Sequence, residues 1–167
     1  MLTIQRGERR FQVRAAALVR SEGYVLLHRT EGDGFWTLPG GRVEFGEDSA
    51  ATVVREVKEE LGVRARCVGL AFITETFFEH REEKFHEVGF VLFAELAQGA
   101  AQLDKSVSHS GIEAGCRLEF RWFPESELSA LEVFPKFLRN TSLDNGIFPR
   151  YIVEREEAIG RVVTPDA

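Results

Sequence analysis

Apolar and polar positions along the chain predict a hairpin of two strands near its beginning. Residues 11–19 are rich in strand-forming side chains and alternate in polarity at their start, and residues 24–27 form a second apolar run. Ser21, Glu22 and Gly23 lie between the two runs, and a Glu-Gly pair suits a tight β-turn. The pattern therefore predicts a β-hairpin. Further strands are expected over residues 63–74, 88–96 and 118–123.

Residues 48–61 show the clearest helical pattern. Asp48 or Ser49 is suited to cap the first turn, and Gly62 is suited to end the helix. Apolar side chains recur at spacings of 4, 3 and 4 residues, so one apolar stripe runs along the helix and is expected to face the core. The stripe consists of Ala50, Val54, Val57 and Leu61.

The remainder of the chain carries weaker signals. Residues 98–115 are rich in small residues, glycine and serine, and are expected to form a long loop. Residues 125–131 and 135–138 are weak helical candidates, and the tail from Glu154 is expected to fray. Strands around one central helix predict an α+β domain, a helix–sheet–helix sandwich. The length of 167 residues predicts a single domain over residues 1–167.

Charge and composition exclude several classes of function. The chain has 21 basic and 27 acidic residues and a net charge of −6, so it lacks the broad basic surface of a protein that binds duplex nucleic acid. No apolar run approaches the roughly 20 residues of a membrane span, and the first residues do not form a secretory signal. Cys67 and Cys116 fit no CxxC pattern and are expected to be free thiols. We therefore expect a soluble cytoplasmic protein.

A second face of the predicted helix is acidic. Glu56, Glu59 and Glu60 stand at positions i, i+3 and i+4, so their carboxylates project together, on a face other than the apolar stripe. Like charges this close repel one another, and a hard divalent cation such as Mg²⁺ or Mn²⁺ would relieve the repulsion. Taken alone, three acidic residues on a helix more often mark a solvated surface. The residues around them decide between the two interpretations.

The surrounding residues fit a longer pattern. Residues 41–63 read Gly-x5-Glu-x7-Arg-Glu-Val-x-Glu-Glu-x-Gly-Val, which resembles the Nudix box of the Nudix (MutT-like) hydrolases at every defining position. The preceding residues 36–47 and the run Arg121-Trp122-Phe123-Pro124 are also similar to that family. The resemblance implies a Nudix fold, an α/β/α sandwich with a mixed central sheet, over about residues 10–140.

The resemblance also implies roles for the residues of the box. The implied metal ligands are Glu56, Glu59, Glu60 and the carbonyl of Gly40. Glu56 is the first candidate to orient or deprotonate a water molecule. Arg55 directly precedes Glu56 and is not expected to share its face. Instead, the resemblance implies that Arg55 pairs with Glu47 and braces the loop before the helix.

Candidates outside the box are less well defined. Some family members recruit an extra glutamate from a distant loop or strand, and Glu119 is the first candidate for this acid here. Glu113 and Glu87 rank below it, and for each of the three an exposed structural glutamate is the more common role. The candidates for substrate contact are Arg29, Arg42 and Phe35. An aromatic residue such as Phe35 stacks on a base or belongs to the core with about equal frequency.

The resemblance implies hydrolysis of a phosphoanhydride in a nucleoside diphosphate linked to a moiety X. Divalent ions neutralise the phosphate oxygens and make a bound water easier to ionise, and a carboxylate takes its proton. The products would be a nucleoside monophosphate and phosphate-X, or pyrophosphate where the substrate is a triphosphate. Nucleoside triphosphates, oxidised nucleotides and nucleotide sugars all remain open as substrates.

Two alternatives belong to other classes of function. A non-catalytic, nucleotide-sensing binding module on the same fold is disfavoured because every box carboxylate is present. A non-hydrolytic isomerase would need further metal ligands and a Cys nucleophile, and Cys67 and Cys116 have no evident partner. Turnover of a phosphoanhydride separates both from the hydrolase. The resemblance also allows a homodimer, which the sequence leaves open.

Overall fold

The computed structural model describes residues 1–80, 82–143 and 148–155. Its strands are β1 (Thr3–Arg6), β2 (Arg9–Ser21), β3 (Tyr24–Thr30), β4 (Trp36–Thr37), β5 (Gly40–Arg42), β6 (Ala65–His80), β7 (Glu83–Leu96), β8 (His109–Glu113), β9 (Cys116–Pro124), β10 (Val133–Phe134) and β11 (Arg150–Arg155). The helices of these residues are the α-helix α1 (Ser49–Leu61) and the 3₁₀ helices η1 (Ala101–Leu103), η2 (Glu125–Ala130) and η3 (Lys136–Arg139).

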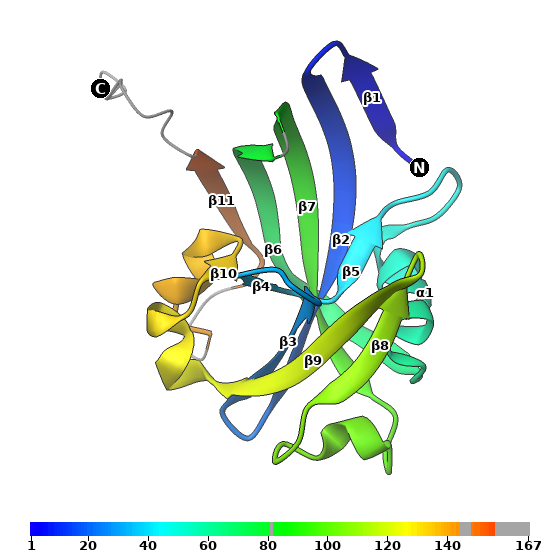
Figure 1. The fold of residues 1–167 in the computed structure, drawn as a ribbon, viewed down its shortest axis with the longest axis vertical. Coiled ribbons are helices and arrows are strands. Elements are labelled where there is room, and N and C mark those ends of the chain that lie inside the picture. Colours follow the sequence, from blue (N-terminus) through cyan, green and yellow to red (C-terminus); the bar gives the residue numbers. More distant parts are fainter. Residues whose placement is uncertain (81, 144–147, 156–167) are drawn as a thin grey trace.

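The strands form a mixed sheet. Its main path runs in the order β10-β4-β3-β2-β7-β6-β11 (Figure 1). Along this path β4 and β10, β2 and β7, and β6 and β11 pair in parallel, and the other neighbours are antiparallel. β1 and β5 pair with β2, and β8 joins through β9, which pairs with β3. The predicted mixed sheet is confirmed.

The predicted hairpin is present as β2 and β3. Glu22 and Gly23 form its turn with φ values of 51° and 77°, the left-handed conformations that suit the twist of a two-residue hairpin. Before this turn, β2 runs beside β7 over eleven parallel residue pairs. One face of this long strand belongs to the core below α1, and the other face borders the cavity described in the next section.

β6 and β7 are longer than the sequence pattern predicts. They pair with each other along nearly their whole length. Their added residues, 75–80 and 83–87, mix charged and aromatic side chains. This end of the hairpin projects away from α1 (Figure 1), so an apolar run marks only the half of each strand that lies in the core.

α1 begins and ends as predicted. The Asp48 carboxylate accepts a hydrogen bond from the Ala51 backbone N–H at 2.8 Å, which satisfies one of the free donors of the first turn. At the other end Gly62 takes the left-handed conformation, with φ 73°, and its N–H donates to the Lys58 carbonyl. Glycine suits this position because it carries no Cβ.

The buried arc of α1 is wider than the predicted stripe. Val54 was expected in the core but is 37% exposed, whereas Val53 is fully buried. Glu56 and Glu60 are buried as well, so two of the three carboxylates of the acidic face are shielded from solvent, whereas Glu59 is exposed. The reason is that β5 and β8 both contact the helix and cover this second face. Backbone from distant parts of the chain therefore decides the burial of these two glutamates.

The predicted loop over residues 98–115 is wrong in part, because it contains η1 and β8. β8 forms a hairpin with β9. Gly111 of β8 lies so close to α1 that a Cβ on it would collide with the Glu60 backbone oxygen. A strand that packs through a glycine carries little apolar signal, and for that reason the pattern of apolar residues missed it.

Two apolar clusters lie on opposite sides of the sheet, because alternate residues of β2 belong to each. α1 packs on one cluster, and Leu128 of η2 and Leu138 of η3 pack on the other. The helix–sheet–helix arrangement is confirmed, with 3₁₀ helices as the second helical layer. The predicted frayed tail lies, beyond Arg155, outside the described residues. Within the described residues, no helix has the length and apolar character needed to cross a membrane.

Candidate active site

The bend at Pro39 joins β4 to β5 and leads into Gly40 and Gly41, the first residues of β5; we call these three residues the glycine turn. The glycine turn lies against two carboxylates of α1. Gly40 has φ 142°, and a Cβ there would collide with the Ala15 backbone. A Cβ on Gly41 would collide with the Glu56 carboxylate. The Gly40 N–H donates a hydrogen bond to Glu60 Oε2 at 3.2 Å. The two glycines therefore allow the backbone of the turn to approach the helix.

Glu60 is the most deeply buried of the box carboxylates. It is 2% exposed, and its Oε1 has no hydrogen-bond partner among the described residues. Burial raises its pKa to about 8, against the attraction of Arg14 and together with the repulsion of Glu113 and Glu56. Burial also raises the pKa of Glu56. A buried carboxyl with an unpaired oxygen is costly, and a cation would lower that cost.

Arg55 joins the loop to the acidic face of the helix. Its Nε and Nη2 donate to the two carboxylate oxygens of Glu47 at 2.8 and 3.0 Å, which is the pairing that the resemblance implies. This bonding lowers the pKa of Glu47 to about 2. The expectation that Arg55 does not share the face of Glu56 is wrong. Its Nη1 donates to Glu56 Oε1 at 2.8 Å and to Glu59 Oε2 at 3.1 Å, because the long arginine side chain reaches across the helix.

The three box carboxylates point in two directions. Arg55 holds Glu56 and Glu59, whereas Glu60 faces Gly40. Within the described residues, no group of three acidic, His or Cys side chains is spaced to hold a metal ion as it stands. The Glu59 side chain is 59% exposed, so it can leave its surface ion pair at little cost. The unpaired Glu60 oxygen, which lies close enough to Glu56 and Glu113 for their charges to raise its pKa, fits a hard divalent cation.

Glu119 lies away from this acidic face. Its neighbours Leu118 and Phe120 belong to the apolar cluster on which α1 packs, so the Glu119 side chain points to the opposite side of β9. There it forms an ion pair of 2.7 Å with Arg29 and accepts a hydrogen bond from the Ser108 hydroxyl at 3.1 Å. The structure therefore separates the first candidate for an extra acid from the glutamates of the box.

The two lower-ranked candidates lie on opposite sides of the sheet. Glu113 follows Gly111 by two residues and shares the face of β8 that packs on α1. Its charge helps to raise the pKa of Glu60. Glu87 lies across the sheet in a cavity, where it accepts a hydrogen bond from Gln12. Of the three candidates, Glu113 is the one whose charge acts on the box carboxylates.

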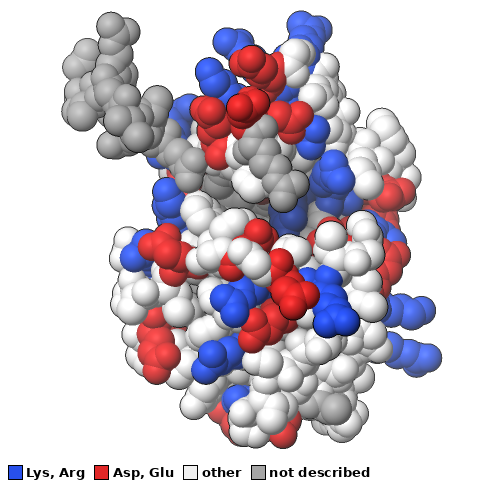
Figure 2. Space-filling view, viewed as in Figure 1, with Lys and Arg blue, Asp and Glu red and all other residues white. Residues whose placement is uncertain are grey.

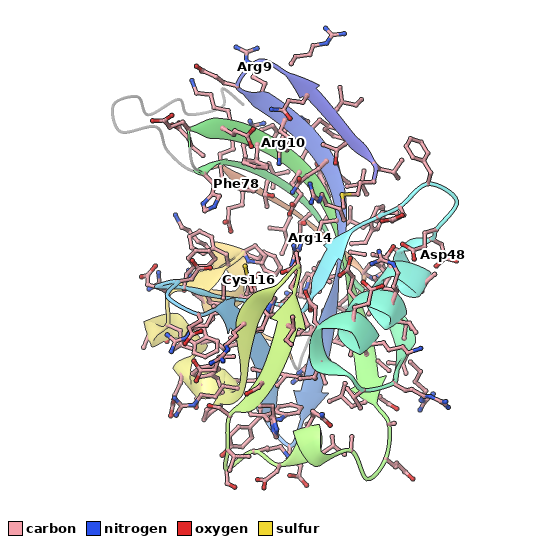
Figure 3. The ribbon with its side chains drawn as sticks, turned by 45° about the vertical axis from the view of Figure 1, so that its right-hand side comes forward. Arg9, Arg10, Arg14, Asp48, Phe78 and Cys116 are labelled. Atoms are coloured by element: carbon pink, nitrogen blue, oxygen red, sulfur yellow. The ribbon has the colours of Figure 1, made fainter. Side chains whose placement is uncertain are left out.

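A cavity of about 410 Å³ opens on the face of the sheet away from α1. This volume falls within the range of about 300–1,000 Å³ that small-molecule sites occupy. Polar side chains of the strands form its floor, namely Gln12, Arg14, Thr74, Thr76 and Glu87. Aromatic side chains surround them, including Phe35, Phe78, Phe85 and Phe134. Figure 3 shows Phe78 on the projecting hairpin and Arg14 at the base of the same opening.

Arg14 connects this cavity with the box carboxylates. Its Nη2 donates to the Leu38 carbonyl at 3.2 Å, just before the glycine turn. Its positive charge favours the ionised forms of Glu56 and Glu60. The sequence analysis did not single out Arg14. The available signal was that Gln12 and Arg14 are polar residues two positions apart at the start of an otherwise apolar strand.

The three candidates for substrate contact lie in different places. Phe35 lines the cavity and meets Phe134 edge to face at 5.2 Å. Arg29 is held by its ion pair with Glu119 and lies over the Trp36 ring, 4.5 Å from its centre. Arg42 lies beside Arg14 in the pairing of β5 with β2. Basic and acidic side chains intermingle over the face shown in Figure 2.

The mixed sheet between two helical layers is the arrangement that the resemblance to the Nudix hydrolases implies. The chain belongs to this family, because the model of the NUDIX domain matches residues 10–143. A solved NUDIX hydrolase from Nitrosomonas europaea superimposes with a TM-score of 0.57 at 24% identity, covering 86% of this chain and 78% of that one. At this identity the likeness shows the fold alone.

Two curated relatives carry names that mention a substrate. The protein named "Putative ADP-ribose pyrophosphatase YjhB" of Bacillus subtilis (strain 168) is 29% identical over 121 residues, which cover 72% of this chain and 51% of that protein. The mouse (Mus musculus) protein named "8-oxo-dGDP phosphatase NUDT18" is 31% identical over 116 residues, 68% of this chain and 32% of that protein. The chain thus spans about half or less of the length of these relatives.

Proposed function

We propose that this protein hydrolyses a phosphoanhydride bond in a nucleoside diphosphate linked to a moiety X, with the help of a divalent cation. The observation that carries the proposal is the buried Glu60 carboxyl, which has one unpaired oxygen. It lies beneath a glycine turn, and Arg14 links that turn to a cavity with aromatic walls. A site of this kind can hold a diphosphate between a cation at Glu60 and the guanidinium of Arg14. The aromatic base of the nucleotide would then lie in the cavity.

The residues that would hold the cation are Glu56, Glu59 and Glu60, with the Gly40 carbonyl beside them. Carboxylate and carbonyl oxygens are the ligands that Mg²⁺ and Mn²⁺ prefer, which supports either ion. A bound divalent ion would supply positive charge against the phosphate oxygens and make water easier to ionise. Arg55 would keep Glu56 positioned through its bonds to Glu47 and Glu56.

The protein's own side chains supply orientation and a base. Arg14 would bind a phosphate oxygen from the cavity side, because it lines the cavity and its charge also acts on Glu56 and Glu60. Glu56 would orient or deprotonate the attacking water, since burial raises its pKa and thus its basicity. Glu113 is a better placed auxiliary acid than Glu119, because Glu119 is held by Arg29 on the other face of its strand.

The names of the relatives are compatible with this class of substrate. One name mentions ADP-ribose and another 8-oxo-dGDP, and both compounds contain a nucleoside diphosphate. The phosphoanhydride is the feature that they share, whereas the base and the group X differ. The relatives therefore support the reaction more than any single substrate.

The test is turnover of a panel of nucleoside triphosphates, oxidised nucleotides and nucleotide sugars, with Mg²⁺ and then with excess chelator. We expect at least one compound to yield a nucleoside monophosphate, and we expect the chelator to abolish the reaction. Turnover that persists in chelator would contradict the proposal. A compound that raises the melting temperature but is never hydrolysed would instead favour a nucleotide-sensing binding module.

A further inference from the structure

The cavity has a polar floor that the proposed hydrolysis does not require. Gln12 of β2 lies opposite Glu87 of β7, which lies opposite Thr76 of β6, and all three line the cavity. Gln12 is 8% exposed, and its Nε2 donates to Glu87 Oε2 at 2.5 Å. Because a carboxylate only accepts, this bond fixes which end of the Gln12 amide faces Glu87. The Gln12–Glu87 pair is therefore an ordered polar contact in a cavity whose walls are mainly apolar.

The neighbouring row of the floor leads toward the box. It contains Arg14, Gly89 and Thr74 in the same cross-strand alignment. A Cβ on Gly89 would collide with the Thr74 hydroxyl, so the glycine keeps the row free of a further side chain. Two residues along a strand span roughly 7 Å. The side chains of Arg14 and Gln12 extend this span, so a nucleotide with its phosphate at Arg14 would present its base edge on the Gln12 side of the cavity.

Aromatic side chains flank the polar row. Phe78 and Phe85 lie one row further out and stack on each other, with ring centres 4.7 Å apart and an angle of 2° between the rings. Phe35 and Phe134 line the cavity from β4 and β10 and the residues around them. Aromatic rings stack on any base with little discrimination. Selectivity among bases must therefore come from the polar row.

The unused hydrogen-bonding groups of the row define what they can bind. Within the described residues, the hydrogen bond from Gln12 is the one that Glu87 accepts, so Glu87 keeps Oε1 and the second lone pair of Oε2 as acceptors for the ligand. The Gln12 amide has a second N–H, which remains a donor. The row thus offers a carboxylate beside an amide N–H, and a complementary ligand presents adjacent N–H donors next to a carbonyl oxygen.

We propose that Gln12 and Glu87 select a guanine base. Guanine carries N1–H and an N2 amino group next to the O6 carbonyl, so Glu87 can accept from both nitrogens while Gln12 donates to O6. Adenine and cytosine would turn a ring nitrogen acceptor toward the carboxylate, and uracil places carbonyl groups on both sides of its single N–H. A buried acceptor that faces another acceptor is left without a hydrogen bond, and this strongly disfavours binding of the wrong base. The proposal rests on the proposed function, because it takes the cavity to hold the base of the nucleotide.

Binding of uncleavable analogues tests this selectivity without requiring turnover. The probes are the α,β-methylene diphosphates of guanosine, adenosine, cytidine and uridine, measured by calorimetry with Mg²⁺. We expect the guanosine analogue to bind roughly 10-fold to 100-fold more tightly than the others. In Glu87→Gln the preference should fall to a few-fold, because an amide cannot accept from both guanine nitrogens without presenting its own donors. Glu95→Gln is the matched control, since Glu95 is an exposed glutamate at the far end of the same strand, paired with Arg66.

The outcomes separate this inference from the proposed function. Equal affinity for the four analogues, or a preference for another base, would overturn the inference and leave the hydrolysis standing. Guanine-selective binding without turnover of any compound of the panel would retain the inference and remove the proposed function. A guanine preference that survives unchanged in folded Glu87→Gln would also overturn it. If that variant does not fold, the ranking of the four analogues by the natural protein remains decisive.

Discussion

The Glu60 carboxyl group is buried under the glycine turn at a position where its ionised form is unfavourable. Burial raises its pKa to about 8, while an ordinary glutamate in the unfolded chain titrates near 4.5. Between these two values the folded protein holds a proton that the unfolded chain has lost. Stability must therefore fall as the pH rises through this window, and no such loss occurs below pH 4.5.

This fall of stability with rising pH gives a prediction for the protein kept free of metal ions by a chelator. The free energy of unfolding should decrease by the order of 1–3 kcal/mol between pH 5 and pH 8 because of Glu60, and Glu60→Gln should flatten the decrease. Urea denaturation at several pH values measures it. Glu95→Gln, which removes an exposed carboxylate, should retain the slope. A Glu60→Gln profile parallel to that of the natural protein would contradict the assignment.

At the scale of elements, β8 determines how deeply the acidic end of α1 is buried. Its approach depends on Gly111, where a Cβ would collide with the Glu60 backbone oxygen and with the Phe120 ring. Gly111→Ala should push β8 away from α1 and lower the free energy of unfolding by about 1–3 kcal/mol. Gly69→Ala is the control, because open space surrounds Gly69 in β6. Equal stability of the two variants in chemical denaturation would contradict this account.

The elements also show which parts of the fold can be predicted from sequence. The end of α1 could be predicted to the residue and its start to within one residue, because Asp48 and Gly62 act locally. The hairpin of β2 and β3 could be predicted for the same reason. β8 could not, since its packing depends on a glycine that meets a distant helix. The burial of Glu60 is likewise set by β5 and β8, so the helical pattern alone placed it on an open face.

At the scale of the whole molecule, Arg14 lies where the cavity on one side of the sheet meets the carboxylates on the other. If it binds a phosphate there, Arg14→Gln should reduce kcat/KM roughly 10-fold to 100-fold, the loss expected for a hydrogen bond to a charged group. The reduction should be equal for all bases, because Arg14 does not face the base. Steady-state kinetics on two nucleotides measure it. Arg66→Gln, at an exposed arginine, is the control; loss restricted to one base would contradict the role.

The sequence predicted the box residues but not the cavity that accompanies them. The spacing of Glu56, Glu59 and Glu60 along one helix is local information, and the family pattern added Gly40 and Arg55. The floor of the cavity combines three strands whose parallel and antiparallel register is visible only in three dimensions. Glu119 was favoured by its place in the chain, yet alternation along β9 turns it to the opposite face.

The most direct test of the central claim compares three proteins on one substrate. The natural protein, Glu60→Gln and Glu95→Gln would be assayed with Mg²⁺ on the best compound of the panel, after thermal melting shows that all three are folded. Glu60→Gln should lose about 100-fold or more of the rate, because it removes a proposed cation ligand close to Glu56, the proposed general base. Glu95→Gln should keep the natural rate, since Glu95 lies on the surface with Arg66. A folded Glu60→Gln protein that hydrolyses the substrate at the natural rate would contradict the claim that the buried box carboxylates carry the reaction.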